Sequence, residues 1–283
     1  MRQAVSPLAA SFGLADWPHP PCDTHSHVYP DAHDGRRNDA SLEEYLGVAR
    51  SLGVGRHVVV HSKAHKHDSQ CTLATVARIG LDRARAVVWE DPLWSDVDLE
   101  RLHGAGVRGV RTLYPAGTPV DLAALRNVAA KVGPLGWHLL VQAEAREWPA
   151  CADALNALPC PVVVDHLGRF GPDATLETPQ FQALLRFVRQ GGWVKVAAPY
   201  YGTRNGAADY RPLAARVQAL LEAGGARAIW GLNWPHVNLA PERRPDEHAT
   251  LESLLAVIGC GTQARAVLAE NAAQLYNFTP VTA

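Results

Sequence analysis

Short runs of β-branched and aliphatic residues alternate with longer amphipathic stretches from one end of the chain to the other. Compact apolar runs bounded by turn residues predict strands, and apolar positions that recur every three or four residues predict helices. The expected strands are a run that ends at residues 23–25, followed by residues 56–62, 85–90, 107–113, 137–144, 161–166, 193–198 and 228–233. Helices are expected between them, among others at residues 42–52, 97–105, 122–132, 181–189 and 212–221.

This alternation predicts one α/β domain. Strands that alternate with helices pair in parallel, and eight repeats within 283 residues favour a closed (β/α)8 barrel, the TIM barrel. The barrel is expected to occupy residues 1–283 as a single domain, with residues 1–20 as an N-terminal arm. A doubly wound open sheet is the competing architecture. Glycines in the left-handed conformation are expected to end several helices, namely Gly53, Gly106, Gly133 and Gly191.

The composition argues against several partners and compartments. A formal net charge of −1 provides no field that would attract nucleic acid. No apolar run reaches the ~20 residues that a membrane-spanning helix needs. Five cysteines without a C-x-x-C pair indicate neither a zinc knuckle nor a disulfide framework, so we expect a cytoplasmic protein. Two of the cysteines, Cys71 and Cys260, are interpreted as buried apolar side chains.

Polar side chains gather at the expected carboxyl ends of the strands, where a barrel carries its catalytic residues. His25 and His27 follow the first strand, and their two-residue spacing places both imidazoles on one side of an extended chain. The remaining strands carry His61 with Ser62, Arg111, Gln142 with Glu144, Asp165 with His166, Lys195, and Asn233 with His236. The alternative is that such groups only satisfy loop backbone or form salt bridges. Residues 169–178 and 199–209 are expected to form loops that wall the pocket.

Several short motifs run in order from about Cys22 to Tyr276. They are Asp23-Thr24-His25-Ser26-His27, Arg108-Gly109-Val110-Arg111, Gly136-Trp137-His138, Val164-Asp165-His166-Leu167-Gly168-Arg169 and Trp230-Gly231-Leu232-Asn233-Trp234-Pro235-His236. Together these motifs resemble the amidohydrolase superfamily, in the branch of the 2-pyrone-4,6-dicarboxylate lactonases and D-galactarolactone isomerases. The resemblance implies an amidohydrolase-like barrel that acts on a small lactone.

The resemblance also implies roles for individual side chains. It places His25, His27 and His166 around the lactone carbonyl, where imidazoles can stabilise charge on the oxygen. It implies that Arg111 binds a carboxylate of the substrate, because a guanidinium can make two parallel hydrogen bonds to such a group. Further substrate contacts are expected from Ser62, His65, Gln142, Lys195, Tyr200 and His236.

The sequence departs from the family pattern at the end of the eighth strand. Asn233 stands where hydrolases of the family carry an aspartate that binds metal or deprotonates water. An amide cannot act as a general base near neutral pH, although it donates and accepts hydrogen bonds. Asn233 is therefore expected to position the attacking oxygen, and no cofactor is required. If one divalent metal such as zinc binds weakly, His25, His27 and His166 are its expected ligands.

Three functions are compatible with this pattern. The favoured one is isomerisation of a carboxylated sugar-acid lactone between ring sizes, because a substrate hydroxyl can replace activated water as the nucleophile. The second is hydrolytic ring opening with His166 or another imidazole as the base. The third is a non-catalytic binding barrel, which turnover of any lactone would exclude. Hydroxyl groups suited to a polyol are carried by Ser62, Tyr200, Tyr201 and Thr203. The sequence leaves open whether the chain assembles into a homo-oligomer.

Overall fold

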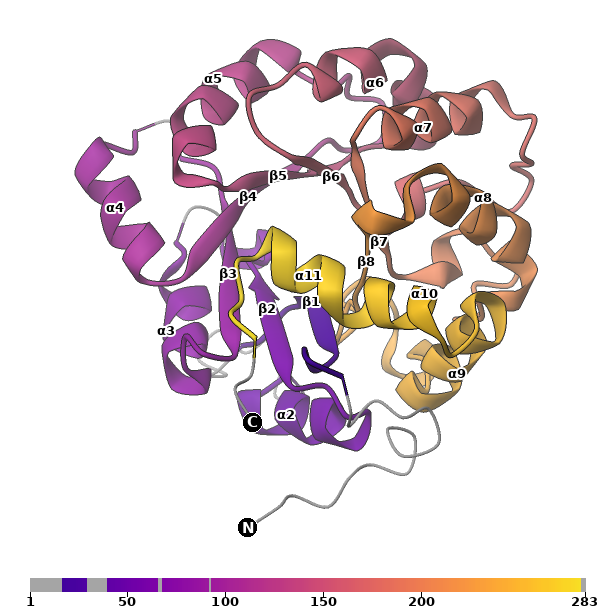
Figure 1. Ribbon diagram of the computed structural model, residues 1–283, viewed down its shortest axis with the longest axis horizontal. Helices are drawn as coiled ribbons and strands as arrows, with labels where there is room; N and C mark the ends of the chain where they lie inside the picture. Colours follow the sequence, from indigo (N-terminus) through magenta and orange to yellow (C-terminus); the bar gives the residue numbers. More distant parts are fainter. Residues whose placement is uncertain (1–16, 30–39, 66–67, 92, 281–283) are drawn as a thin grey trace.

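The computed structural model describes residues 17–29, 40–65, 68–91 and 93–280. Within these residues, eight parallel strands follow one another in chain order around a barrel with helices outside (Figure 1). The strands are β1 (Cys22–Ser26), β2 (Arg56–Val60), β3 (Ala84–Trp89), β4 (Val107–Leu113), β5 (His138–Gln142), β6 (Val162–Val164), β7 (Trp193–Val196) and β8 (Ala228–Trp230). The predicted TIM barrel is confirmed.

The last strand returns to the first and nearly closes the barrel. Ser26 and Trp234 form a parallel bridge, and the His27 amide donates to the Trp234 carbonyl at 2.8 Å. A buried carboxylate reinforces the seam, because Asp23 Oδ1 accepts from the amides of His25 and Leu232, both at 2.9 Å. The backbone of His25 is therefore fixed from two sides.

The helices between the strands are amphipathic and cover the outer face of the barrel. They are α2 (Leu42–Ser51), α3 (Gln70–Ile79), α4 (Asp96–Gly104), α5 (Leu122–Val132), α6 (Trp148–Asn156), α7 (Pro179–Arg189) and α8 (Ala214–Gly224). Three further helices follow the last strand, namely α9 (Glu247–Ile258), α10 (Thr262–Arg265) and α11 (Asn271–Leu275). Capping boxes begin α2 and α4, at Ser41 with Glu44 and at Ser95 with Asp98. A side-chain oxygen thereby satisfies an amide that lacks a partner in the helix itself.

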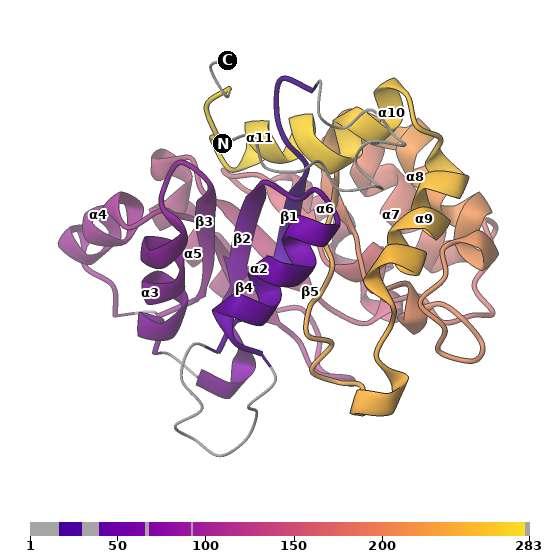
Figure 2. The same ribbon diagram turned by 90° about the horizontal axis from the view of Figure 1, so that it is seen from below.

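The side chains of each strand alternate between the two faces of the barrel wall. On β2, Val58 and Val60 belong to the interior cluster, whereas Val59 packs under the helices. The interior cluster also includes Tyr276 and Phe278, which follow α11. Figure 1 shows α11 lying across the barrel, and Figure 2 places it at the end where the strands begin. The C-terminal segment therefore forms the floor of the barrel.

Two arginines hold this floor in place. Arg56 and Arg85, the first residue of β2 and the second residue of β3, lie with their guanidinium carbons 4.8 and 4.4 Å from the centroid of the Phe278 ring. Arg85 also donates to the Tyr276 carbonyl at 3.1 Å and to the Asn277 carbonyl at 2.9 Å. The catalytic face is thus left to the opposite, carboxyl ends of the strands.

Some local expectations were wrong. The helix that includes residue 132 does not stop at a left-handed Gly133, whose φ is −56°; a 3-10 turn continues to Leu135, and Gly136 ends it with φ 70°. Cys260 is exposed and Cys71 only partly buried. Residues 1–16 of the predicted arm lie outside the described residues. Among the described helices, none has the length and apolar character needed to cross a membrane.

Candidate active site

Two histidines, one on β1 and one directly after it, face each other at the mouth of the barrel. The Nε2 atoms of His25 and His27 lie 3.2 Å apart. His27 Nδ1 lies 2.8 Å from the Val60 carbonyl, which can only accept, so Nδ1 carries the proton. The Nε2 atom of a neutral His27 is therefore an unprotonated acceptor, directed at His25.

Asp165 lies at the centre of the site, at the start of a strained turn. His166, Leu167 and Arg169 all have positive φ, between 49° and 55°, which non-glycine residues rarely adopt. This turn brings His166 Nε2 to 3.4 Å from Asp165 Oδ2, and the His25 ring to 4.8 Å from the His166 ring. Asp165 Oδ1 lies 3.3 Å from His25 Nδ1. One carboxylate therefore lies against two of the predicted catalytic imidazoles.

Lys195 lies on β7 next to the His25 ring and is completely buried. Its Nζ donates to the Thr24 carbonyl at 2.9 Å and lies 3.3 Å from His25 Nδ1. Burial lowers the pKa of Lys195 to about 8, although Asp165 acts in the opposite direction. These contacts make Lys195 a support for His25 and Asp165.

The charges of the cluster follow from burial. Burial lowers the pKa of His27 to about 3 and that of His166 to about 4. Burial raises the pKa of Asp165, but its interactions with His166, His25 and Lys195 outweigh this effect and hold the pKa well below its usual range. Near neutral pH the site thus contains an ionised carboxylate among uncharged imidazoles.

Arg111 and Gln142 form a second group on the neighbouring strands β4 and β5. Arg111 Nη2 donates to Gln142 Oε1 at 2.9 Å and lies 3.9 Å from Asp165 Oδ2. Arg111 Nη1 donates to the His61 carbonyl at 3.3 Å. Its guanidinium is therefore held in one orientation beside the histidines, as the binding of a carboxylate requires.

The third group contains Asn233. Its side-chain amide donates to the Tyr200 hydroxyl, which also lies 3.3 Å from His236 Nδ1. On the other side of the His236 ring, Nε2 lies 2.6 Å from Glu247 Oε1. All four residues come from the loops after β7 and β8 or from the first turn of α9.

The other two predicted substrate contacts lie after β2. The Ser62 hydroxyl is 2.5 Å from the Tyr29 hydroxyl, and the His65 ring lies 5.2 Å from the Tyr29 ring. Both side chains thus contact Tyr29, which sequence reasoning did not single out. It follows His27 by two residues, and this spacing is the signal that could have identified it.

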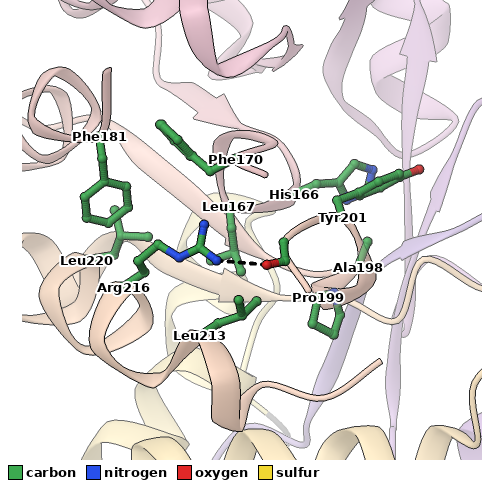
Figure 3. Close-up of a pocket in the computed structure, with 11 residues that line it drawn as sticks. His166, Leu167, Phe170, Phe181, Ala198, Pro199, Tyr201, Leu213, Arg216 and Leu220 are labelled. Carbon is green, nitrogen blue, oxygen red and sulfur yellow. Dashed lines mark hydrogen bonds between the residues drawn. The ribbon is translucent and has the colours of Figure 1, made fainter. Parts of the chain in front are cut away.

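A small pocket opens beside His166, between the turns that follow β6 and β7 (Figure 3). Apolar side chains such as Phe170, Phe181 and Leu220 line it. The guanidinium of Arg216 donates at 3.0 Å to the carbonyls of Gly171 and Gly202, so it ties the two loops together. Most of its lining is apolar, and the polar side chains in it are His166, Tyr201 and Arg216.

The central cluster has the donor types of a zinc site. His25, Asp165 and His166 each offer a ligand atom, and these atoms lie within 4.8 Å of one another. Asp165 Oδ2 is buried and makes no hydrogen bond to the described residues. Imidazole nitrogens with a carboxylate oxygen fit a divalent cation such as zinc. This set contains Asp165 in the place that the sequence prediction gave to His27.

Almost the whole chain matches one known protein family. The family model described as amidohydrolase matches residues 16–278. The chain belongs to the amidohydrolase family. This amidohydrolase is 32% identical to a 2-pyrone-4,6-dicarboxylate hydrolase of Comamonas testosteroni, over 90% of this chain and 89% of that protein. It is 27% identical to a D-galactarolactone isomerase of Agrobacterium fabrum, with 100% of both chains covered.

The fold of this amidohydrolase is also similar to solved structures. An apo structure from Agrobacterium tumefaciens is matched with a TM-score of 0.82 and 28% identity, over 94% of this chain and 98% of that one. A structure from Pseudomonas putida, described as that of a putative 2-pyrone-4,6-dicarboxylic acid hydrolase, is matched with a TM-score of 0.80 and 26% identity. The match covers 92% of this chain and 98% of that one. The family expected from the motifs is confirmed, and the chain is an enzyme of this family.

Proposed function

We propose that this amidohydrolase isomerises a carboxylated sugar-acid lactone between ring sizes. The observation that carries the proposal is Asn233, whose amide donates to Tyr200 at the end of the eighth strand. An amide in this place cannot activate water. A hydroxyl of the substrate, held next to the lactone carbonyl, needs less activation because proximity supplies much of the acceleration. Relatives named as lactone hydrolases and as a galactarolactone isomerase support the substrate class.

In this proposal each of the three groups has its own task. Arg111, oriented by Gln142, binds the substrate carboxylate. His25, His27 and His166 surround the lactone carbonyl and stabilise negative charge on its oxygen. A zinc ion held by His25, Asp165 and His166 would supply Lewis acidity to the same carbonyl. Asn233 orients the attacking hydroxyl.

Ring-opening hydrolysis is the second candidate, and one observation favours it. His166 Nδ1 is buried and makes no hydrogen bond to the described residues, while Nε2 faces Asp165. A neutral His166 that donates from Nε2 has a free lone pair on Nδ1, which can accept a proton from water. In this mechanism Asp165 and His166 act together as a base, and Asn233 serves only to bind.

Product analysis separates the two candidates. The enzyme, after metal analysis, is mixed with D-galactaro-1,5-lactone and followed by proton NMR, which resolves the 1,4-lactone from the open acid. We expect rapid formation of the 1,4-lactone, with the open acid forming no faster than in an enzyme-free blank. Enzyme-dependent open acid without the 1,4-lactone would establish the hydrolase instead, and no change in either would contradict the choice of substrate.

Replacing Asn233 tests the observation itself. Asn233→Asp restores a carboxylate that can deprotonate water, so it should increase the open acid relative to the 1,4-lactone in the same NMR assay. Asn233→Ser, which removes the amide without adding a base, is the matched control. An Asn233→Asp enzyme that hydrolyses no faster than the wild type would indicate that an imidazole already serves as the base.

A further inference from the structure

Tyr200, His236 and Glu247 form a chain of side chains that the proposed roles leave unused. Three polar contacts connect these side chains to one another and to Asn233. The Asn233 amide donates to the Tyr200 hydroxyl, this hydroxyl lies 3.3 Å from His236 Nδ1, and His236 Nε2 lies 2.6 Å from Glu247 Oε1. The side chain of His236 is 3% exposed and that of Glu247 10%. The chain therefore lies inside the protein and ends at the residue that replaces the family's carboxylate.

The direction of each hydrogen bond follows from the chemistry of the partners. Glu247 can only accept, so His236 carries its proton on Nε2 and leaves Nδ1 as an acceptor. The Tyr200 hydroxyl therefore donates to Nδ1. Since Asn233 donates to the Tyr200 oxygen, one lone pair of that oxygen is occupied and the other is left for a substrate hydroxyl.

We infer that Tyr200, His236 and Glu247 form a proton relay that takes over the task of the absent carboxylate at position 233. This inference rests on the proposed function, because the relay acts on the hydroxyl that attacks the lactone. Tyr200 is the catalytic residue, whereas His236 and Glu247 are positioning residues that act through it. The arrangement resembles a nucleophile, histidine and carboxylate triad, with a phenol in place of the nucleophile.

The protons balance over the isomerisation. As the substrate hydroxyl attacks the carbonyl carbon, its proton passes to the Tyr200 oxygen and the Tyr200 proton passes to His236 Nδ1. The new C–O bond forms as the π electrons of the C=O bond move onto the carbonyl oxygen, and an imidazolium next to the Glu247 carboxylate holds the extra proton; the C=O bond re-forms in the next step. When the C–O bond to the departing ring oxygen breaks, the proton returns through Tyr200 to that oxygen. No proton is gained or lost, which suits a reaction whose substrate and product are isomers.

The charge of Tyr200 is consistent with this role. Burial raises the pKa of Tyr200 well above its ordinary value, so the residue remains a phenol and can donate to His236. The amide of Asn233 also fits, because an aspartate there would accept the Tyr200 proton and turn it away from His236. Asparagine at position 233 and the relay are therefore parts of one arrangement.

Kinetics of single variants test the relay. Tyr200→Phe and Glu247→Gln should lower kcat for lactone isomerisation by about 100-fold, with KM changed by less than about threefold. Glu247→Asp keeps the charge and should recover part of the loss. Tyr276→Phe is the matched control, because the Tyr276 hydroxyl lies in the floor of the barrel, buried and without a hydrogen-bond partner among the described residues. Its kcat should stay close to that of the wild type.

Nitrogen NMR of enzyme labelled in its histidines tests the relay without turnover. His236 should be protonated at Nε2 and unprotonated at Nδ1, and Glu247→Gln should weaken this preference. Unchanged kcat in Tyr200→Phe, or a His236 protonated at Nδ1, would overturn the relay. If the wild type converts no lactone, the proposed function fails, and the tautomer of His236 still decides whether the hydrogen bonds run in the inferred direction.

Discussion

Hydrogen bonds from neighbouring residues fix the orientation of individual side chains in the site. Arg111 shows this most clearly, because one nitrogen is directed at Gln142 and another at a backbone carbonyl, while Asp165 lies 3.9 Å away. Arg111 is 5% exposed, and these contacts hold its guanidinium in a single plane. A flexible ammonium group could not make the same pair of contacts to a carboxylate.

Replacing this arginine should therefore affect binding more than chemistry. Arg111→Lys should raise KM for a carboxylated lactone by about 10- to 100-fold, because a charged hydrogen bond contributes about 1.5–3 kcal/mol. Steady-state kinetics with matched lactones, one with the carboxylate and one without it, measure the effect. Arg108→Lys, on the same strand but bonded to the carbonyls of His103 and Val107, is the control. An equal loss with both lactones would contradict carboxylate binding by Arg111.

At the scale of elements, strands and their order could be predicted from sequence because each is a compact apolar run between turns. The end of β6 was harder: residues 161–166 were expected to be extended, but the strand ends at Val164 and His166 enters a left-handed turn. Periodicity contains no signal for such a turn, which tertiary contacts maintain. The sequence places Asp165 among the polar residues at strand ends but assigns it no catalytic role, because its central position depends on contacts with β1 and β4. Glu247 could not be predicted, because a helix brings it to His236 from eleven positions along the chain.

The C-terminal segment is an element whose stabilising role can be measured. Phe278→Ala should lower the free energy of unfolding by about 3–5 kcal/mol, since it removes a buried ring and its two cation–π contacts. Phe278→Leu keeps most of the volume and should lose less. Denaturant titration gives both values, and the activity of folded protein in the cold should be preserved. A Phe278→Ala protein as stable as the wild type would show that the floor contributes little.

The whole molecule should lose stability as the pH falls below 6.5. Burial lowers the pKa of His27, His57 and His138 to about 3, so between pH 6.5 and 3 the unfolded chain binds protons that the folded chain does not. Each such histidine contributes a slope of about 1.4 kcal/mol per pH unit. Asp23 opposes them, because burial raises its pKa to about 6 and the folded chain then binds a proton first. Three histidines act against one aspartate, so the net effect is a loss of stability as the pH falls.

Denaturation midpoints between pH 7.5 and 5 measure this slope. His138→Leu is the informative variant, because both ring nitrogens of His138 are buried without a hydrogen-bond partner among the described residues. The variant should unfold with a flatter pH dependence and keep its stability at pH 7.5. A slope identical to that of the wild type would mean that His138 takes no part in the acid sensitivity.

Within the described residues, α11 and Phe278 close the barrel at the end where the strands begin, so a ligand reaches the histidines from the opposite end. A ligand that arrives at the histidines must leave by the path on which it came, so a product cannot be displaced from behind by the next substrate. For an isomerisation the two competitors have the same formula and nearly the same shape. Product should therefore inhibit competitively, and progress curves should slow well before equilibrium is reached.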